Sequence, residues 1–333
     1  MTRTVERPAA GGVLAPLRRF QEGIGLLVIF AVIVVVMSQL SPFFLTPGNL
    51  LNLLLASSTI SMIAVFTTML MIGGGLDLSV GAVTALAGIV IAEYQATLGI
   101  WGAAGLGIVV ASLMGLLNGV MVTYVRINPF ITTLATMSLA RGIAFVLADG
   151  LTIPVYEESF AWLGEGLVLG IPVPVIVSAA LFILVWITLR YTAYGRAMYA
   201  MGGNAEASRL AGLRIARYRL MAYILSGFSA GFAGVFLTSR LYAAAPQAAT
   251  GLELSVIAAV VLGGTSLAGG KGTILGTLFG VLILGTLNNG MVLLSLSSDY
   301  QQIVQGIVLL LAVGLDQLRL GGLGRLVRGR AAE

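Results

Sequence analysis

The stretch LLNLLLASSTISMIAVFTTMLMI, residues 50–72, contains no charged residue, and GGGLDLS, residues 73–79, follows it directly. A helix needs about 20 mainly apolar residues to cross the hydrocarbon core of a bilayer. The preceding segment, residues 46–49, carries Pro47, which suits the first turn of a helix. Residues 50–72 therefore predict a membrane span, and the glycine-rich run predicts its end.

The rest of the chain repeats this pattern. Its 333 residues are 58% hydrophobic and 9% charged, whereas an average soluble domain has about 25% charged residues. The 44 glycines agree with closely packed membrane helices. We predict an all-α, polytopic membrane protein with one membrane-embedded unit and about ten spans. These spans lie at about residues 24–42, 50–72, 79–98, 102–125, 129–148, 172–190, 220–240, 254–268, 274–294 and 300–317.

The charges of the loops predict the topology, because arginine and lysine collect on the cytoplasmic side. Residues 1–23 hold four arginines, so we expect this N-terminal tail inside. Residues 149–171 hold four acidic residues and no basic one, so they are expected outside, five spans later. The segments 190–219 and 319–333 are basic and are expected inside. The number of spans between these segments and the sign of their charges are both consistent with ten spans in residues 24–318 and with both termini in the cytoplasm.

Several chemistries are excluded by composition and motif. The chain has no cysteine and no histidine, which argues against disulfides, thiolate catalysis, histidine-based proton relays and most transition-metal sites. Residues 269–273, GGKGT, resemble a phosphate-binding loop, but Gly272 and Thr265 stand where that motif needs a serine or threonine and a glycine. We therefore predict no cofactor and no metal on this chain, and any ATP must be bound by another polypeptide. The apolar run 26–37 lacks a cleavage site of small residues, so it is read as an uncleaved span.

The basic segment 190–219 predicts a short cytoplasmic helix. Gly202 and Gly203 are expected to break the chain, Asn204 to cap a helix, and Gly212 to end it. Glu206 suits the positive first turn of such a helix. Ala207, Leu210 and Ala211 share one face, while Arg209 points elsewhere. A helix this short is unstable alone, so the segment is either a docking helix for another protein or a basic loop at the membrane surface.

Polar residues within the predicted spans are candidates for a translocation path or gate. Asp77 either caps the third span or positions a gate, and Arg141 needs a partner or an aqueous cavity. Neutral polar groups either bond helix to helix or line a path for a polyhydroxylated solute. The candidates for the path or gate are Asp77, Ser79, Asn118, Arg141, Asn288 and Asn289.

Two glycine-rich breaks, at residues 71–81 and 262–276, lie an even number of predicted spans apart. Both are therefore expected at the same side of the membrane. Such breaks either line a substrate route or form tight helix connections.

Four runs carry a family resemblance. They are GGGLDLSVGA at 73–82, NGVMVTYVRINPFITTLATMSLARGI at 118–143, GRAMYAMGGNAEASRLAGLRI at 195–215 and AAVVLGGTSLAGGKGTILGTLFGVLILGTLNNGMVLL at 258–294. The chain resembles the ribose-type permeases of bacterial sugar ABC importers, in the branched-chain amino acid and ribose permease superfamily. The resemblance extends from about Gln21 to Leu318.

The resemblance implies a type II ABC importer-like permease in the bacterial inner membrane. It implies three kinds of partner: an ABC ATPase subunit, a periplasmic sugar-binding protein and a second permease copy. It also implies that the loop 190–219 contacts the ATPase. The residues implied for ATPase coupling are Gly202, Gly203, Asn204, Glu206, Arg209, Leu210 and Gly212.

Two other classes are weighed against this one. An ion-coupled secondary transporter would use Asp77, Glu93 or Arg141 in its coupling path and would need no ATPase. A polytopic membrane enzyme would need a cluster of reactive groups near one membrane face, and no such cluster stands out in the sequence.

Overall fold

The computed structural model describes residues 14–317, and nearly all of them lie in helices. The helices are α1 (Leu14–Leu40), α2 (Pro47–Ile72), α3 (Val80–Val120) with a π-helical turn η1 (Met121–Val125), α4 (Pro129–Leu147), α5 (Glu158–Glu165), α6 (Val173–Tyr191), α7 (Ala193–Gly203), α8 (Ala205–Leu210), α9 (Ile215–Leu241), α10 (Leu252–Leu262), α11 (Ile274–Leu293) and α12 (Ser298–Gln317). Two small antiparallel strand pairs complete the fold. β1 (Ile153–Pro154) pairs with β4 (Ala243–Ala244), Ile153 opposite Ala244, and β2 (Leu167–Val168) pairs with β3 (Ile171–Pro172).

Six of the described helices are long and apolar enough to cross a bilayer, namely α2, α3 with η1, α4, α6, α9 and α11. Two predicted spans, 79–98 and 102–125, form the single element α3–η1, which is kinked at Gly99 (φ 67°, ψ 160°). The apolar part of α1, Gly25–Leu40, and the helix α10 are also apolar but are shorter than these six helices. The all-α, membrane-spanning fold is confirmed, whereas the count of ten spans stays a prediction.

Two boundaries differ from the sequence-based expectation. α1 begins at Leu14, within the segment expected to be an N-terminal tail, and the tail 319–333 lies outside the described residues. α10 ends at Leu262, not at 268, because Gly263 caps the helix and Gly264 takes a left-handed conformation (φ 86°). Glycine adopts that conformation without steric penalty, so the chain leaves the helix there.

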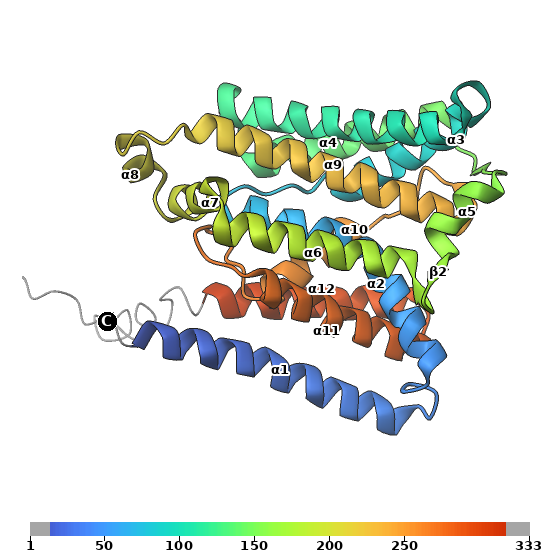
Figure 1. The fold of residues 1–333 in the computed structure, drawn as a ribbon, viewed down its shortest axis with the longest axis horizontal. Coiled ribbons are helices and arrows are strands. Elements are labelled where there is room, and N and C mark those ends of the chain that lie inside the picture. Colours follow the sequence, from blue (N-terminus) through green and yellow to red (C-terminus); the bar gives the residue numbers. More distant parts are fainter. Residues whose placement is uncertain (1–13, 318–333) are drawn as a thin grey trace, which may run out of the picture.

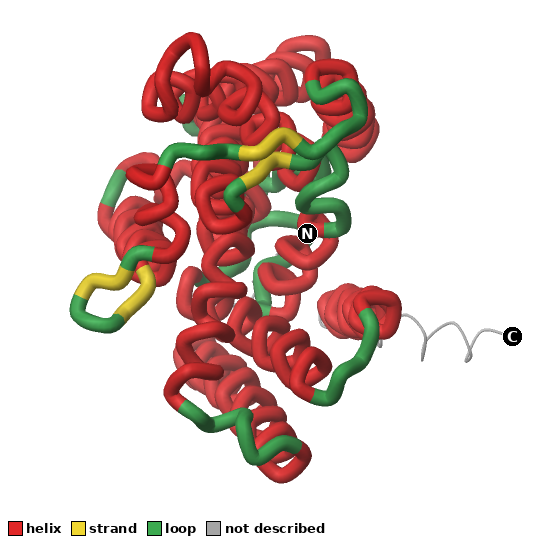
Figure 2. The backbone as a smooth tube through the Cα atoms, turned by 90° about the vertical axis from the view of Figure 1, so that its right-hand side faces the viewer, coloured by secondary structure: helices red, strands yellow, loops and turns green. Residues whose placement is uncertain are grey.

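The long helices run side by side, so the bundle has two ends (Figure 1). α7 and α8 lie at one end, together with the start of α1 and the end of α12. α5 and the hairpin β2–β3 lie at the other end. Figure 2 looks onto that second end and shows both strand pairs near the viewer. The basic segment 190–219 and the acidic segment 149–171 are thus at opposite ends of the bundle, as the charges predict.

The core is formed by the second half of α2 and the start of α3, where residues 61–72 and 80–92 are all buried. Close packing comes from small residues where α3 crosses α9. Gly115 lies against the backbone of Tyr223 and Gly227, and Gly227 lies against the carbonyl of Ala111. Small residues let membrane helices approach closely, where van der Waals contacts replace the hydrophobic effect. In contrast, α4, α6 and α12 keep many large apolar side chains exposed, as surfaces toward lipid or another subunit do.

This packing yields a stability prediction. In Gly227→Val the new side chain overlaps the Ala111 carbonyl oxygen and the Gly115 backbone, so α3 and α9 must separate. Overpacking of this kind destabilises by roughly 1–3 kcal/mol. We expect a clearly lower midpoint of thermal unfolding in detergent, followed by size-exclusion chromatography. The matched control is Gly105→Val, also on α3, because a side chain there meets no neighbour. Equal midpoints for the two variants would contradict the packing argument.

Candidate functional site

The short helix α8 is formed as predicted and is carried at the basic end of the bundle. Asn204 caps it, because its Oδ1 accepts a hydrogen bond from the Ala207 N–H at 2.9 Å. At the other end Gly212 has φ 86°, and the N–H groups of Gly212 and Leu213 donate to the carbonyls of Arg209 and Ser208 at 3.0 Å. These two bonds are the Schellman pattern that ends a helix. The predicted start at Asn204 and stop at Gly212 are both confirmed.

The surface of α8 combines an ion pair with an uncovered leucine. Arg209 donates to both carboxylate oxygens of Glu206, at 2.5 and 3.1 Å. The hydrogen bond and charge of Arg209 lower the pKa of Glu206, so this carboxylate stays ionised at neutral pH. Exposed pairs of this kind add little stability, so the pair mainly fixes the charge pattern of the surface. The Leu210 side chain is 76% exposed, so the apolar side of α8 is not covered by this chain.

Gly202 and Gly203 do not break the chain, which corrects the expectation from the sequence. Both lie in the last turn of α7, and the break comes one residue later, at Asn204. Gly202 instead permits a close approach: a side chain there would overlap the carbonyl group of Ile72 and the N–H of Gly270. A side chain on Gly203 would meet nothing. Two adjacent glycines thus have different roles.

The two glycine-rich breaks meet at the same place. The Gly270 N–H donates to the Ile72 carbonyl oxygen at 2.8 Å, joining the α10–α11 connection to the end of α2. The Tyr199 hydroxyl of α7 donates to the Gly272 carbonyl at 2.9 Å. The prediction that both breaks lie on one side is confirmed. We call the end of α2 together with residues 263–273, which α7 contacts, the junction.

A buried polar cluster lies directly beyond the junction, on the segment between α2 and α3. Asp77 is 1% exposed. Its Oδ1 accepts from the N–H and hydroxyl of Ser79 at 2.9 and 2.6 Å, and its Oδ2 accepts from the Ser226 hydroxyl at 2.7 Å. Asn118 Nδ2 donates to the Ser79 hydroxyl at 3.0 Å. Three sequence candidates, Asp77, Ser79 and Asn118, are therefore brought together.

The cluster differs in detail from the expected helix cap. The N-cap residue of α3 is Ser79, and Asp77 bonds the backbone of that residue, not that of the first helical turn. Asp77 joins three elements: the break, the end of α3 through Asn118, and α9 through Ser226. The Tyr223 hydroxyl also donates to the Leu76 carbonyl at 3.2 Å. Sequence reasoning missed Ser226 and Tyr223, whose only signal was polarity within an apolar span.

The remaining candidates lie apart from this cluster. Arg141 of α4 donates to the carbonyls of Pro246 and Ala248, at 2.5 and 2.8 Å, near the opposite end of the bundle. Asn288 accepts from Gln305 of α12 at 3.2 Å. Asn289 and Asn49 exchange two hydrogen bonds of 2.9 Å. The two asparagines thus bond helix to helix, which is the simpler of the two roles considered for them.

Long apolar helices with irregular, glycine-rich backbone packed between them are typical of multi-pass membrane transport proteins. Residues 49–313 match the family described as branched-chain amino acid transport system / permease component. The chain belongs to this family, as a permease subunit of the bacterial inner membrane.

Three similar proteins illustrate the relationship. The ribose import permease protein RbsC of Bacillus subtilis is 45% identical over 86% of this chain and 90% of its own length. The RbsC protein of Escherichia coli K12 is 44% identical over 87% and 92%. The L-arabinose ABC transporter permease protein AraH of Azospirillum brasilense is 41% identical over 93% and 91%. No solved structure matches the chain.

The different roles of the adjacent glycines give a prediction about the junction. Gly202→Ala places a methyl group on the Ile72 carbonyl and should destabilise the protein by about 1–3 kcal/mol. Gly203→Ala is the matched control, expected to be neutral or stabilising by up to about 1 kcal/mol, because alanine favours helix over glycine. The readout is the thermal unfolding midpoint of each purified variant. If Gly203→Ala destabilises as much as Gly202→Ala, the junction is not packed as described.

Proposed function

We propose that this chain is the transmembrane permease subunit of an ATP-driven importer for a monosaccharide, either ribose or another pentose or hexose. The observation that carries the proposal is 44–45% identity to ribose import permeases over 86–87% of the chain. The relatives named for L-arabinose support a sugar substrate without selecting one sugar. The chain itself performs no covalent chemistry in this proposal and binds no cofactor.

In this proposal the chain crosses the membrane ten times with both termini in the cytoplasm. The ten crossings are α1, α2, the two halves of α3–η1, α4, α6, α9, α10, α11 and α12. The start of α1 and the end of α12 lie at the same end of the bundle, as an even number of crossings requires (Figure 1). The partners are an ABC ATPase on the basic side, a periplasmic sugar-binding protein on the acidic side, and a second permease copy.

The proposed mechanism is alternating access driven through α8. The exposed Leu210 and the Glu206–Arg209 pair form the surface that contacts the ATPase. Movement of α8 passes to α7 and then to the junction, where Gly202 touches both Ile72 and Gly270. The junction connects to Asp77, which is bonded to α3 and α9. In this proposal a displacement of α8 therefore reaches α2, α3, α9 and the connection between α10 and α11.

Replacing the exposed leucine tests the docking surface. Leu210→Arg puts a charge where an apolar contact is expected, without disturbing a buried group. We expect normal membrane insertion, loss of ATPase co-purification, and sugar uptake reduced by at least roughly tenfold, since removing a central apolar anchor commonly weakens an interface by 2 kcal/mol or more. The matched control for ATPase binding is Leu169→Arg, a 99% exposed leucine at the opposite end of the bundle, which should retain the co-purifying ATPase. If Leu210→Arg retains the ATPase and transports normally, α8 is not the docking helix.

The main alternative is an ion-coupled secondary transporter using Asp77, Glu93 or Arg141. It differs from the ATP-driven importer in the energy source for sugar uptake. We expect vesicles that contain this chain alone to take up no sugar under an imposed proton or sodium gradient. Adding the ATPase, ATP and a sugar-loaded binding protein should restore uptake. The measurement is radiolabelled ribose and arabinose accumulation, with each sugar tested against its own loaded binding protein. Gradient-driven uptake by the isolated chain would overturn the ATP-driven proposal.

A further inference from the structure

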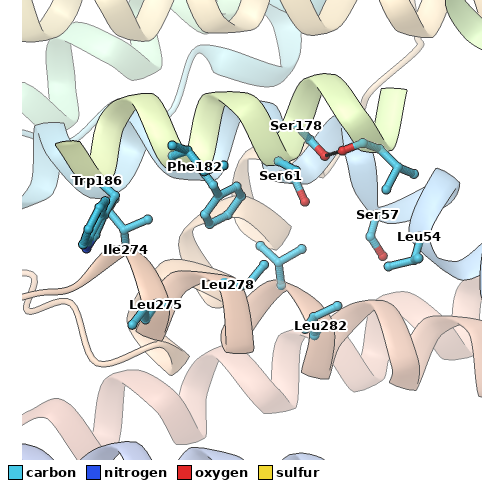
Figure 3. A pocket seen from close by; sticks show the side chains of 14 residues that line it. Leu54, Ser57, Ser61, Ser178, Phe182, Trp186, Ile274, Leu275, Leu278 and Leu282 are labelled. Carbon is cyan, nitrogen blue, oxygen red and sulfur yellow. Dashed lines mark hydrogen bonds between the residues drawn. The ribbon is translucent and has the colours of Figure 1, made fainter. Parts of the chain in front are cut away.

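The described residues form a deep apolar groove on the side of the bundle. A cavity of about 500 Å³ lies between α6 and α11, with α2 as its floor (Figure 3). Its wall is mostly aliphatic and aromatic, and Phe182, Trp186 and Leu278 are among the lining side chains. Among the described residues, Ser57, Ser61 and Ser178 are its only polar lining residues. The Ser178 hydroxyl donates to the Val175 carbonyl of its own helix, and the Ser57 hydroxyl is buried without a hydrogen-bond partner in residues 14–317. The predominantly apolar lining suits a hydrocarbon chain.

The groove has the length of one leaflet. Along α6 it extends from Trp186 to Val175, which at 1.5 Å per residue is about 17 Å. Half of a hydrocarbon core of about 30 Å is about 15 Å. The volume falls within the roughly 300–1,000 Å³ of typical small-molecule sites. An extended acyl chain that enters from one membrane surface therefore fits the groove.

Exposed basic residues lie beside one end of the groove, whereas Arg240, near the other end, is half-buried and donates to the Leu55 carbonyl at 3.2 Å. Ile274 and Trp186 line the first of these ends, and Lys271 and Arg190 lie three and four residues beyond them. Both basic side chains are exposed, and among the described residues the only ion pair is Arg209–Glu206. Trp186 packs edge-on against Tyr191, with ring centroids 5.6 Å apart. Tryptophan and tyrosine are enriched at the level of the lipid headgroups.

We propose that this groove binds a phospholipid with an anionic headgroup. One acyl chain lies between α6 and α11, and the phosphate headgroup contacts Arg190 and Lys271. Basic pockets between membrane helices on the cytoplasmic side are a recognised form of anionic lipid site. The assignment to the cytoplasmic leaflet rests on the proposed orientation. The bound lipid connects the end of α6 with the start of α11, which are the elements beside α7 and the junction.

Quenching of Trp186 fluorescence tests the site directly. The chain has three tryptophans, so Trp101→Phe with Trp162→Phe leaves Trp186 as the only emitter. The full chain is reconstituted in phosphatidylcholine containing increasing fractions of lipid brominated on one acyl chain. We expect brominated phosphatidylglycerol to reach half-quenching at a roughly tenfold lower mole fraction than brominated phosphatidylcholine. Ordinary surrounding lipid would quench equally in both cases.

Two sets of variants separate the site from general charge effects. In the same background, Arg190→Gln with Lys271→Gln should abolish the preference for phosphatidylglycerol. Arg214→Gln with Arg217→Gln removes the same charge from exposed positions on and just before α9 and should retain it. Ala179→Leu fills the groove from an exposed position on α6, leaves both basic residues in place, and should also reduce the preference.

Three outcomes would overturn the proposal. These are equal quenching by the two brominated lipids, a preference that survives Arg190→Gln with Lys271→Gln, and no quenching by either lipid. The last result would mean that a second protein copy covers the groove. The measurement uses no sugar, ATP or ATPase, so its failure is independent of any failure of the transport assignment.

Discussion

The hydrogen bond from the Gly270 N–H to the Ile72 carbonyl is the contact on which the arrangement of the basic end depends. A helix that stops inside a membrane protein leaves backbone groups without partners, and water is not available in the hydrocarbon core to satisfy them. Here the end of α2 and the connection between α10 and α11 bond to each other. Glycines at 202, 269 and 270 let three backbones come this close. Irregular backbone is therefore tolerated only because its segments are in contact.

The junction and the Asp77 cluster together explain how a surface helix can be connected to the membrane core. α7 contacts the junction through backbone atoms of Gly202 and the hydroxyl of Tyr199, and not through long flexible side chains. Ile72, which accepts the hydrogen bond of the Gly270 N–H, lies five residues before Asp77 and seven before Ser79. Asp77 is then bonded to residues of α3 and α9. α7 is therefore connected to α9 through short backbone contacts and the buried, hydrogen-bonded Asp77.

Local features were predictable from sequence, and contacts between distant residues were not. The cap at Asn204 and the stop at Gly212 follow from residues within one turn, and the membrane spans follow from about 20 residues each. The role of Gly202 depends on Ile72 and Gly270, which are far away in sequence, so a chain break and a close approach were indistinguishable there. Asn289 is likewise hydrogen-bonded to Asn49, which lies 240 residues earlier in the sequence. Asp77 was identified as a candidate, but its partner Ser226 required knowledge of where α9 packs.

The two ends of the bundle are closed by different physical means. At the basic end, the backbone of Gly202 packs directly against Ile72 and Gly270, with no side chain between them. At the acidic end, the guanidinium of Arg141 holds the carbonyls of Pro246 and Ala248 to α4. The two ends are therefore held by different contacts, close backbone packing at the basic end and side-chain hydrogen bonds to a loop at the acidic end.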